Sequence, residues 1–189
     1  FIPAAFWSMT VLKIALASAA TLFLYLEILR NDLKGKFKTW KFNEFMEKCR
    51  NELDCGEMIL SHFYLLLGCS IPFWLCNESK SSSLQLSLSS FSGVISLGIG
   101  DSLASIGGKK FGRTTWHYKT RKTLEGSFFG FIGMFISWLV MRKVCCSKIS
   151  VQGIFINSIF SAVWEALVPL NDNLSLPIWT FLLFNKTII

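Results

Sequence analysis

Apolar residues gather in six long segments of the chain, separated by short polar or basic stretches. A helix that crosses the hydrocarbon core of a bilayer, about 30 Å thick, needs roughly 20 mostly apolar residues. The pattern therefore predicts an all-α fold, a polytopic transmembrane helical bundle with about six spans. The predicted spans are Ala4–Leu29, Met58–Cys76, Leu84–Ile106, Ser127–Met141, Ile149–Val168 and a sixth that starts near Leu174.

The third predicted span differs from the others because it is rich in serine and glycine. Small residues in a membrane helix let neighbouring helices approach closely, so we expect this span in the interior of the bundle. The chain starts at Phe1 and stops at Ile189, inside an apolar run. We therefore interpret residues 1–189 as a single membrane-embedded domain from a longer protein, missing an N-terminal part.

The overall composition supports a membrane protein. The 189 residues are 52% hydrophobic and 16% charged, whereas an ordinary soluble domain has about 25% charged residues. The same composition excludes a disordered chain and a secreted disulfide scaffold.

The basic residues, which give a net charge of +7, are unevenly distributed between the two sides of the predicted bundle. Thirteen lie in or beside segments 31–57 and 107–126, and four lie on the opposite side. Cytosolic loops carry an excess of Lys and Arg, so we expect both segments to be cytosolic. Segment 31–57 also alternates aromatic and basic residues, which fits either an amphipathic helix on the membrane surface or a solvated linker.

Nearly all the ionisable residues of the predicted spans gather at this same face. A charged group inside a span costs roughly 3 kcal/mol on insertion scales and by default indicates function. The alternative is that each one pairs with a neighbour or reaches the headgroups; for the set as a whole we favour function. The residues are Glu27, Arg30, His62, Asp101 and Glu165.

Segment 100–127 has the composition of a phosphate-binding loop. Its glycines allow backbone amides to approach an anion, and its clustered Lys and Arg neutralise the charge. Asp101 and Glu125 offer carboxylates to Mg²⁺, which prefers one or two carboxylates together with phosphate oxygens. The chain has neither a Walker A motif nor a dinucleotide fingerprint. On composition alone, a basic loop that contacts anionic lipids explains the segment at least as well.

A spaced motif in this segment changes that balance. Asp101, Ala104, Gly108 and Gly112 follow one another at intervals of three, four and four residues. After eight further residues comes Arg121-Lys122-Thr123-x-Glu125-Gly126. This arrangement resembles the CTP-binding signature of the dolichol kinase family, which has Lys-Lys where this chain has Arg-Lys.

The resemblance extends beyond the motif. The run His62-Phe63-Tyr64-Leu65-Leu66-Leu67-Gly68 is similar to the family's His-Phe-x-Leu-Leu-Leu-Gly segment, and Glu165 with Asn171-Asp172-Asn173-Leu174 resembles its last conserved elements. The resemblance implies the C-terminal catalytic portion of a multi-pass enzyme of the endoplasmic reticulum with a cytosolic active face. Such an enzyme phosphorylates the terminal hydroxyl of dolichol with CTP and Mg²⁺ or another divalent cation, giving dolichyl phosphate for protein glycosylation. Its implied partners are dolichol, CTP and the lipid bilayer, without nucleic acid.

A mechanistic hypothesis for phosphoryl transfer assigns roles to these residues. Asp101 is the first choice for the metal, with Glu125 and Asp172 as further ligands, and Glu165 or His62 is the general base. Trp116 lies inside the segment; it either stacks on cytosine or, as we favour, has an interfacial role. The residues expected to bind CTP are Gly107, Gly108, Lys109, Lys110, Gly112, Arg121, Lys122, Thr123, Glu125 and Gly126.

Three other functions remain open. A kinase for another isoprenoid alcohol, such as phytol or farnesol, shares parts of the motif, and a CTP-using lipid cytidylyltransferase is a more distant relative. Outside enzymes, the polar residues fit a membrane transporter, whose site normally lies near the bilayer midplane between repeats. No internal repeat is present, and the polar residues gather at one face.

Overall fold

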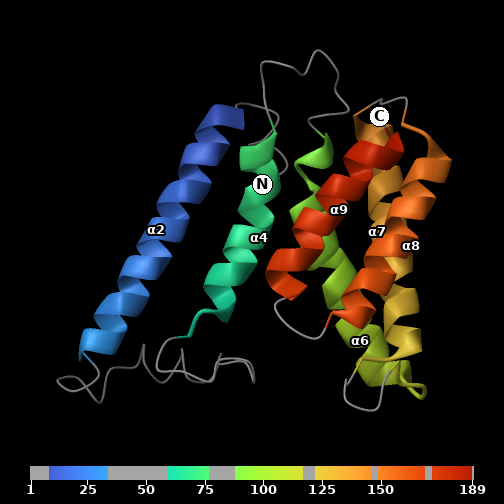
Figure 1. The fold of residues 1–189 in the computed structure, drawn as a ribbon, viewed down its shortest axis with the longest axis horizontal. Coiled ribbons are helices and arrows are strands. Elements are labelled where there is room, and N and C mark those ends of the chain that lie inside the picture. Colours follow the sequence, from blue (N-terminus) through green and yellow to red (C-terminus); the bar gives the residue numbers. More distant parts are fainter. Residues whose placement is uncertain are drawn as a thin grey trace. The chain divides into compact units, whose positions relative to one another are not determined.

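A computed structural model shows that the described part of the chain is helical, which confirms the all-α prediction (Figure 1). It contains no strand, only an isolated antiparallel bridge between Thr115 and Thr123. Contacts divide the chain into two compact units, Phe1–Leu67 and Gly68–Ile189. The described residues are 9–33, 59–76, 88–116, 122–145, 149–168 and 172–188.

The first unit contains helix α2 (Met9–Leu33) and the start of helix α4 (Ser61–Leu75). Near the end of α2, the buried side chains of Glu27 and Arg30 form an ion pair, with Nε and Oε2 2.7 Å apart. The amide of Ile59 also donates to the Glu27 carboxylate. These two residues therefore pair with each other, which is the alternative to a functional role that the sequence left open. Each charge neutralises the other within one helix turn.

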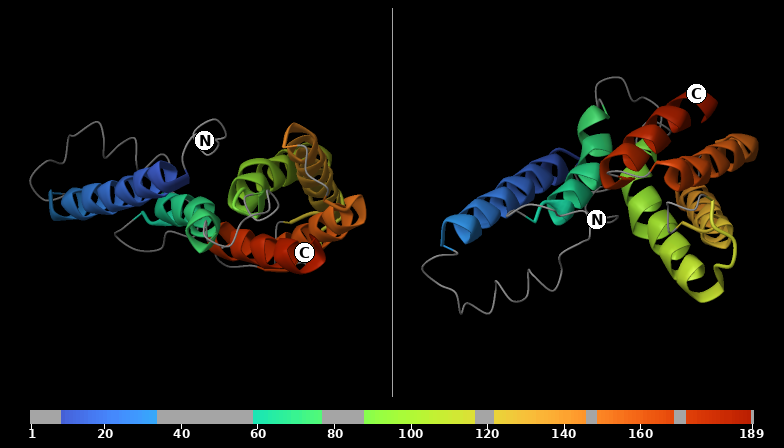
Figure 2. Two further views of the ribbon diagram at one scale, coloured as in Figure 1. Left: turned by 90° about the horizontal axis from the view of Figure 1, so that it is seen from above. Right: turned by 60° about the horizontal axis from the view of Figure 1, so that its bottom comes forward.

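The described residues of the second unit contain the end of α4 and the helical elements η2, α6, α7, α8 and α9. Helices α7, α8 and α9 form an arc around the π-helix η2, and all three contact it (Figure 2). The chain continues from η2 directly into α6, which packs on α7. These elements are η2 (Val94–Asp101), α6 (Ser102–Phe111), α7 (Leu124–Val144), α8 (Val151–Leu167) and α9 (Asp172–Ile188).

Small residues bring η2 and α6 very close to α7. A Cβ atom added at Gly126 would lie 2.8 Å from the carbonyl oxygen of Ala104, and one at Gly100 would lie 2.7 Å from the Met134 side chain. Serines that precede and enter η2 are fully buried: Ser89, Ser90, Ser92 and Ser96. The prediction that the serine- and glycine-rich segment lies in the interior is therefore confirmed for residues 88–97, whereas Gly98, Ile99, Ser102, Ser105 and Ile106 are exposed.

Polar and aromatic contacts hold α8 against α9. The Asn157 amide donates to the carbonyl of Thr180 at 3.1 Å, and the hydroxyls of Thr180 and Ser161 lie 3.1 Å apart. One turn further along α8, Trp164 stacks on Trp179 with ring centroids 4.1 Å apart. Since side-chain hydrogen bonds in such interiors strengthen helix pairing, these contacts fix the end of α8 that carries Glu165.

Two helices in the described ranges, α2 and α7, are long and apolar enough to cross a membrane. Helices α4 and α8 are apolar but shorter. The outer side of α7 presents large apolar side chains to the surroundings, which suits contact with lipid; they include Phe128, Ile136, Val140 and Val144. These features agree with a helical membrane bundle, and the number of six spans stays a prediction.

Candidate active site

The glycine-rich motif lies on a helix. The segment that contains Gly107 and Gly108 belongs to α6, which ends where the amide of Gly112 donates to the carbonyl of Gly108 at 3.0 Å. In an α-helix the backbone amides bond to carbonyls four residues earlier, so they are not open to a phosphate. The prediction of a loop over residues 100–127 is therefore wrong for residues 100–111 and 124–127, which are helical.

The helical form explains the spacing of the motif. Residues three and four apart share one face of a helix, so Asp101, Ala104 and Gly108 point to the same side. Gly107 instead faces Phe129 of α7, where an added Cβ would lie 2.5 Å from the ring. The small residues of the motif thus let α7 pack closely against α6, and Asp101 lies at the edge of that contact.

A short paired arm connects α6 to α7. The amide of Trp116 donates to the carbonyl of Lys122 at 3.1 Å, and the amide of Leu124 donates to the carbonyl of Thr114 at 2.9 Å. Residues 113–116 and 122–124 therefore run antiparallel around the bridge of Thr115 and Thr123. This pairing places Lys122 immediately before the first turn of α7.

Two side chains stabilise the beginning of α7. Thr123 is the N-cap residue, and its hydroxyl accepts a hydrogen bond from the amide of Gly126 at 3.1 Å. The carboxylate of Glu125 accepts from the amide of Thr114 at 3.2 and 3.3 Å. An acidic group in the first turn also interacts favourably with the helix dipole. Glu125 therefore holds the arm against the helix.

Lys122 reaches from the arm to the end of α8. Its ammonium group lies 2.9 Å from the Glu165 carboxylate and 2.5 Å from the Glu165 backbone carbonyl. The side chain of Glu165 is 8% exposed and that of Lys122 24% exposed. The pair thus joins the arm to α8 between residues 43 positions apart in sequence and keeps a carboxylate and an ammonium group at a shielded position.

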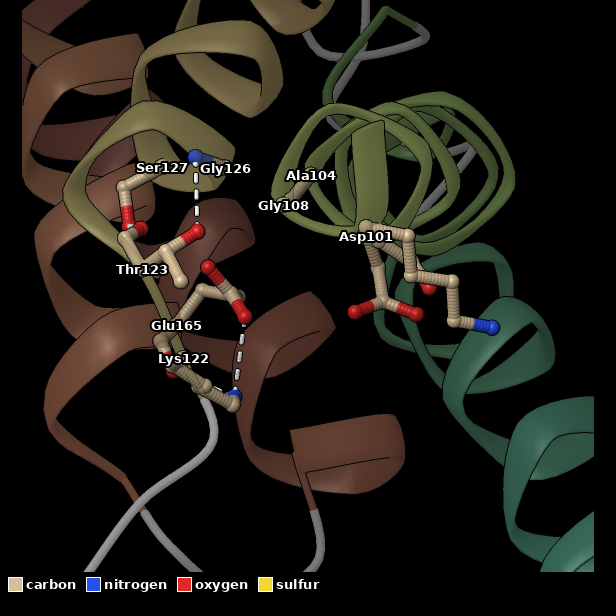
Figure 3. A pocket seen from close by; sticks show the side chains of 10 residues that line it. Asp101, Ala104, Gly108, Lys122, Thr123, Gly126, Ser127 and Glu165 are labelled. Carbon is tan, nitrogen blue, oxygen red and sulfur yellow. Dashed lines mark hydrogen bonds and ion pairs between the residues drawn. The ribbon is translucent and has the colours of Figure 1, made fainter. Parts of the chain in front are cut away.

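A cavity of about 340 Å³ opens beside this pair. Asp101 lies on one side of it, and Glu165, Lys122 and Thr123 lie on the other (Figure 3). The cavity is thus lined by two acidic and two lysine residues, which come from η2, α6, the arm and α8. The residues that line it are Asp101, Ala104, Ser105, Gly108, Lys109, Lys122, Thr123, Gly126, Ser127 and Glu165.

Comparison with known proteins identifies the family. Residues 2–170 match the cytidylyltransferase family. The chain belongs to this family. No solved structure significantly matches the chain.

Within the cytidylyltransferase family, the chain is similar to dolichol kinases. It is 35% identical to dolichol kinase sec59 of Schizosaccharomyces pombe over 92% of its length, 33% identical to dolichol kinase EVAN of Arabidopsis thaliana over 78%, and 30% identical to the human dolichol kinase over 97%. The alignments cover 34%, 25% and 35% of those proteins, so the chain spans about a third of their length or less. The resemblance inferred from the motifs is thereby confirmed.

The structure of this cytidylyltransferase-family chain brings together part of the predicted site. Among the predicted residues, those that line the cavity are Asp101, Gly108, Lys109, Lys122, Thr123, Gly126 and Glu165. Gly107, Lys110, Gly112 and Glu125 do not line it.

Three predicted residues are not placed at the cavity for other reasons. His62 belongs to the first unit, where its Nδ1 is buried and has no hydrogen-bond partner among the described residues. Arg121 lies outside the described residues, and so does the side chain of Asp172 at the start of α9. Their assignments stay predictions.

Two serines line the cavity that the sequence analysis did not select. Ser105 lies four residues after Asp101 and therefore on the same helical face. Ser127 directly follows the motif, and its hydroxyl accepts from the indole Nε1 of Trp116 at 2.9 Å. Ser105 could have been predicted only by interpreting residues 101–112 as a helix. No pattern in the sequence indicated Ser127.

The residues of the cavity fit a divalent cation that is bound together with a nucleotide. The described residues contain no group of three or more His, Cys, Asp or Glu side chains that would enclose a metal by themselves. Mg²⁺ is commonly held by one or two carboxylates plus substrate phosphates. Asp101 and Glu165 are the two carboxylates in the cavity lining.

Proposed function

We propose that this chain is the catalytic part of a dolichol kinase that transfers the γ-phosphoryl group of CTP to the terminal hydroxyl of dolichol. The observation that carries the proposal is the cavity, in which the motif residues Asp101, Lys122 and Thr123 meet Glu165 of α8. The similarity to curated dolichol kinases supports it. Phosphoryl transfer depends on positioning and charge neutralisation, and the cavity offers both.

In this proposal Lys109 and Lys122 neutralise the phosphate oxygens of CTP, and Asp101 holds a divalent cation. The cation, when bound, offsets the charge that develops between the β- and γ-phosphates. Arg121 and Lys110 each adjoin a cavity-lining lysine in the sequence, and both remain predicted phosphate ligands. Nucleotide phosphates give the Lys122 ammonium a second anionic partner besides Glu165.

Glu165 then acts as the general base. The dolichol oxygen attacks the γ-phosphorus, the bond from the γ-phosphorus to the bridging oxygen breaks, and CDP leaves with that electron pair. The hydroxyl proton passes to the Glu165 carboxylate. A general base must lie within hydrogen-bond reach of the proton that it removes, and Glu165 is the candidate base that lines the cavity; His62 is the alternative.

We further propose that the chain is a multi-pass protein of the endoplasmic reticulum membrane with its cavity on the cytosolic side. The distribution of Lys and Arg supports this orientation. An apolar prenyl tail would lie among the membrane helices while its hydroxyl reaches the cavity at the interface.

Transfer of a cytidylyl group is the second candidate function, because the family match itself favours it. The two reactions use the same donor and differ in the bond that breaks. A kinase forms lipid monophosphate and CDP, whereas a cytidylyltransferase forms CDP-lipid and pyrophosphate from a phosphorylated lipid.

An assay with two forms of labelled CTP separates these functions. Purified protein in lipid vesicles is given CTP labelled either at the γ-phosphorus or in the cytosine ring, together with dolichol or, in a parallel sample, with dolichyl phosphate. We expect the γ-label in the lipid fraction and the cytosine label in soluble CDP. Cytosine label in the lipid would instead show cytidylyl transfer, and absence of both labels with dolichol, phytol and farnesol would refute a prenol kinase.

A further inference from the structure

Trp116 holds the arm that carries Lys122 through two hydrogen bonds. Its backbone amide donates to the Lys122 carbonyl at 3.1 Å, and its indole Nε1 donates to the Ser127 hydroxyl at 2.9 Å. Ser127 lies in the first turn of α7. In the sequence it follows Lys122, whereas Trp116 precedes Lys122. The indole therefore ties the arm that carries Lys122 to a rigid helix.

The Ser127 hydroxyl is oriented to receive this bond. It donates its own hydrogen to the carbonyl of Thr123 at 3.2 Å, which leaves its oxygen as an acceptor for the indole. By contrast, the buried indole Nε1 atoms of Trp138, Trp164 and Trp179 have no hydrogen-bond partner within the described ranges. Trp116 thus combines a specific polar contact with its aromatic ring.

Lys122 depends on such support more than a helical residue would. It precedes α7 in an extended arm, which lacks the repeating hydrogen bonds of a helix, and its flexible side chain has four rotatable carbons. Fixing the backbone of one residue costs roughly 1–2 kcal/mol of conformational entropy. Because the backbone of Lys122 is already fixed, ligand binding does not bear this entropy cost when the ammonium group reaches the cavity.

We propose that Trp116 is a positioning residue for the nucleotide: through its bonds to Lys122 and Ser127 it fixes the arm so that the Lys122 ammonium faces the phosphates. This inference rests on the proposed function, because it assumes that the cavity binds CTP. Trp116 does not itself line the cavity, so it acts through Lys122.

The test measures binding of labelled CTP to the purified full chain in lipid vesicles, without prenol. Trp116→Phe keeps the ring and removes the indole donor, and Ser127→Ala removes the acceptor. Losing one neutral hydrogen bond should weaken CTP binding about three- to tenfold. Trp138→Phe is the matched control, since its indole has no such bond, and should leave binding unchanged.

A double-variant cycle separates positioning from a general loss of structure. If Trp116 acts through Lys122, then Trp116→Phe should have no further effect on CTP binding in a Lys122→Met background. Equal losses in both backgrounds would overturn the inference, as would unaltered binding by both Trp116→Phe and Ser127→Ala. If the unchanged protein binds no CTP, the proposed function itself fails; if it binds CTP and only the cycle fails, the proposed function stands and the role of Trp116 does not.

Discussion

The two carboxylates of the cavity have different surroundings. Glu165 is nearly buried and contacts the Lys122 ammonium through both its side chain and its backbone carbonyl. Asp101 lies across the cavity at the junction of η2 and α6, where π-helical geometry gives way to α-helical geometry (Figure 3). π-Helical turns often occur at functional sites. This difference supports separate roles, with Asp101 for the cation and Glu165 for the acceptor hydroxyl.

Replacement of Asp101 should therefore abolish activity without loss of the fold. Asp101→Asn keeps the size of the side chain but removes the charge, and we expect CTP-dependent dolichol phosphorylation to fall at least about 100-fold, since a catalytic cation contributes several kcal/mol. Asp32→Asn is the matched control, because Asp32 is exposed at the end of α2. Activity is measured per amount of protein in membranes; near-normal activity of Asp101→Asn would exclude it as metal ligand.

The pair of Lys122 and Glu165 should affect stability and activity differently. Lys122→Met leaves a shielded carboxylate without its ammonium partner, so we expect a loss of about 1–3 kcal/mol in stability and weaker CTP binding. The double variant Lys122→Met/Glu165→Gln should regain most of the stability, because no charge remains unpaired, but stay inactive. Thermal unfolding in detergent and phosphorylation assays measure the two effects. A double variant as unstable as Lys122→Met would contradict the pairing.

At the scale of elements, the sequence predicted the apolar helices well and the chemistry-bearing segment poorly. The predicted span Ile149–Val168 corresponds to α8, Val151–Leu167, since a long apolar run has few alternatives to a helix in lipid. The segment around Gly107 and Gly108 suggested a phosphate-binding loop because its glycines allow backbone amides to approach an anion, and glycine also has a low helix propensity. The structure overrides this propensity through packing: a side chain at Gly107 would collide with Phe129.

The part of the site that could not be predicted depends on contacts between distant segments. The motif alone identified Asp101, Lys122 and Thr123, but the contact between Lys122 and Glu165 joins residues 43 positions apart. No local pattern reports such a pairing. The spacing of Asp101, Ala104 and Gly108 did have helical periodicity, so their shared helical face could have been predicted from the sequence.

The close contact between α6 and α7 predicts a sharp difference between two glycines. An added Cβ at Gly126 would lie 2.8 Å from the Ala104 carbonyl oxygen and 3.2 Å from Gly108 Cα, both backbone atoms. At Gly98 the nearest atom is a Val94 methyl at 3.9 Å. We expect Gly126→Ala to lower stability by about 1–3 kcal/mol through overpacking and to reduce CTP binding, because Gly126 also lines the cavity.

Gly98→Ala is the control for this substitution. The position is exposed in η2, so alanine should leave thermal stability and CTP binding unchanged or slightly raise stability. Thermal unfolding of both variants in the same detergent makes the comparison. A Gly126→Ala variant with the stability of the unchanged protein would show that α6 and α7 are less closely packed than the structure indicates.

For the whole molecule, the direction of α7 and α8 decides which groups share a membrane face. Helix α7 has 21 residues and is therefore about 31 Å long, close to the thickness of a bilayer core. Its first turn lies at the cavity and its last turn carries Arg142 and Lys143. Helix α8 returns so that Glu165 meets Lys122. Two of the four basic residues that oppose the predicted orientation thus lie at a helix C-terminus, where the helix dipole favours them.

The orientation can be measured with single cysteines in the arm that precedes α7 and in the last turn of α7. In a variant without the six native cysteines, Arg113→Cys lies on the cavity side and Lys143→Cys on the opposite side, both at exposed positions. In sealed microsomes with the cytosolic face outward, a membrane-impermeant maleimide should label Arg113→Cys directly and Lys143→Cys only after permeabilisation. Retained dolichol phosphorylation shows that the variants are folded. Labelling of Lys143→Cys alone would place the cavity in the lumen, away from cytosolic CTP, and immediate labelling of both would show that α7 does not cross the bilayer.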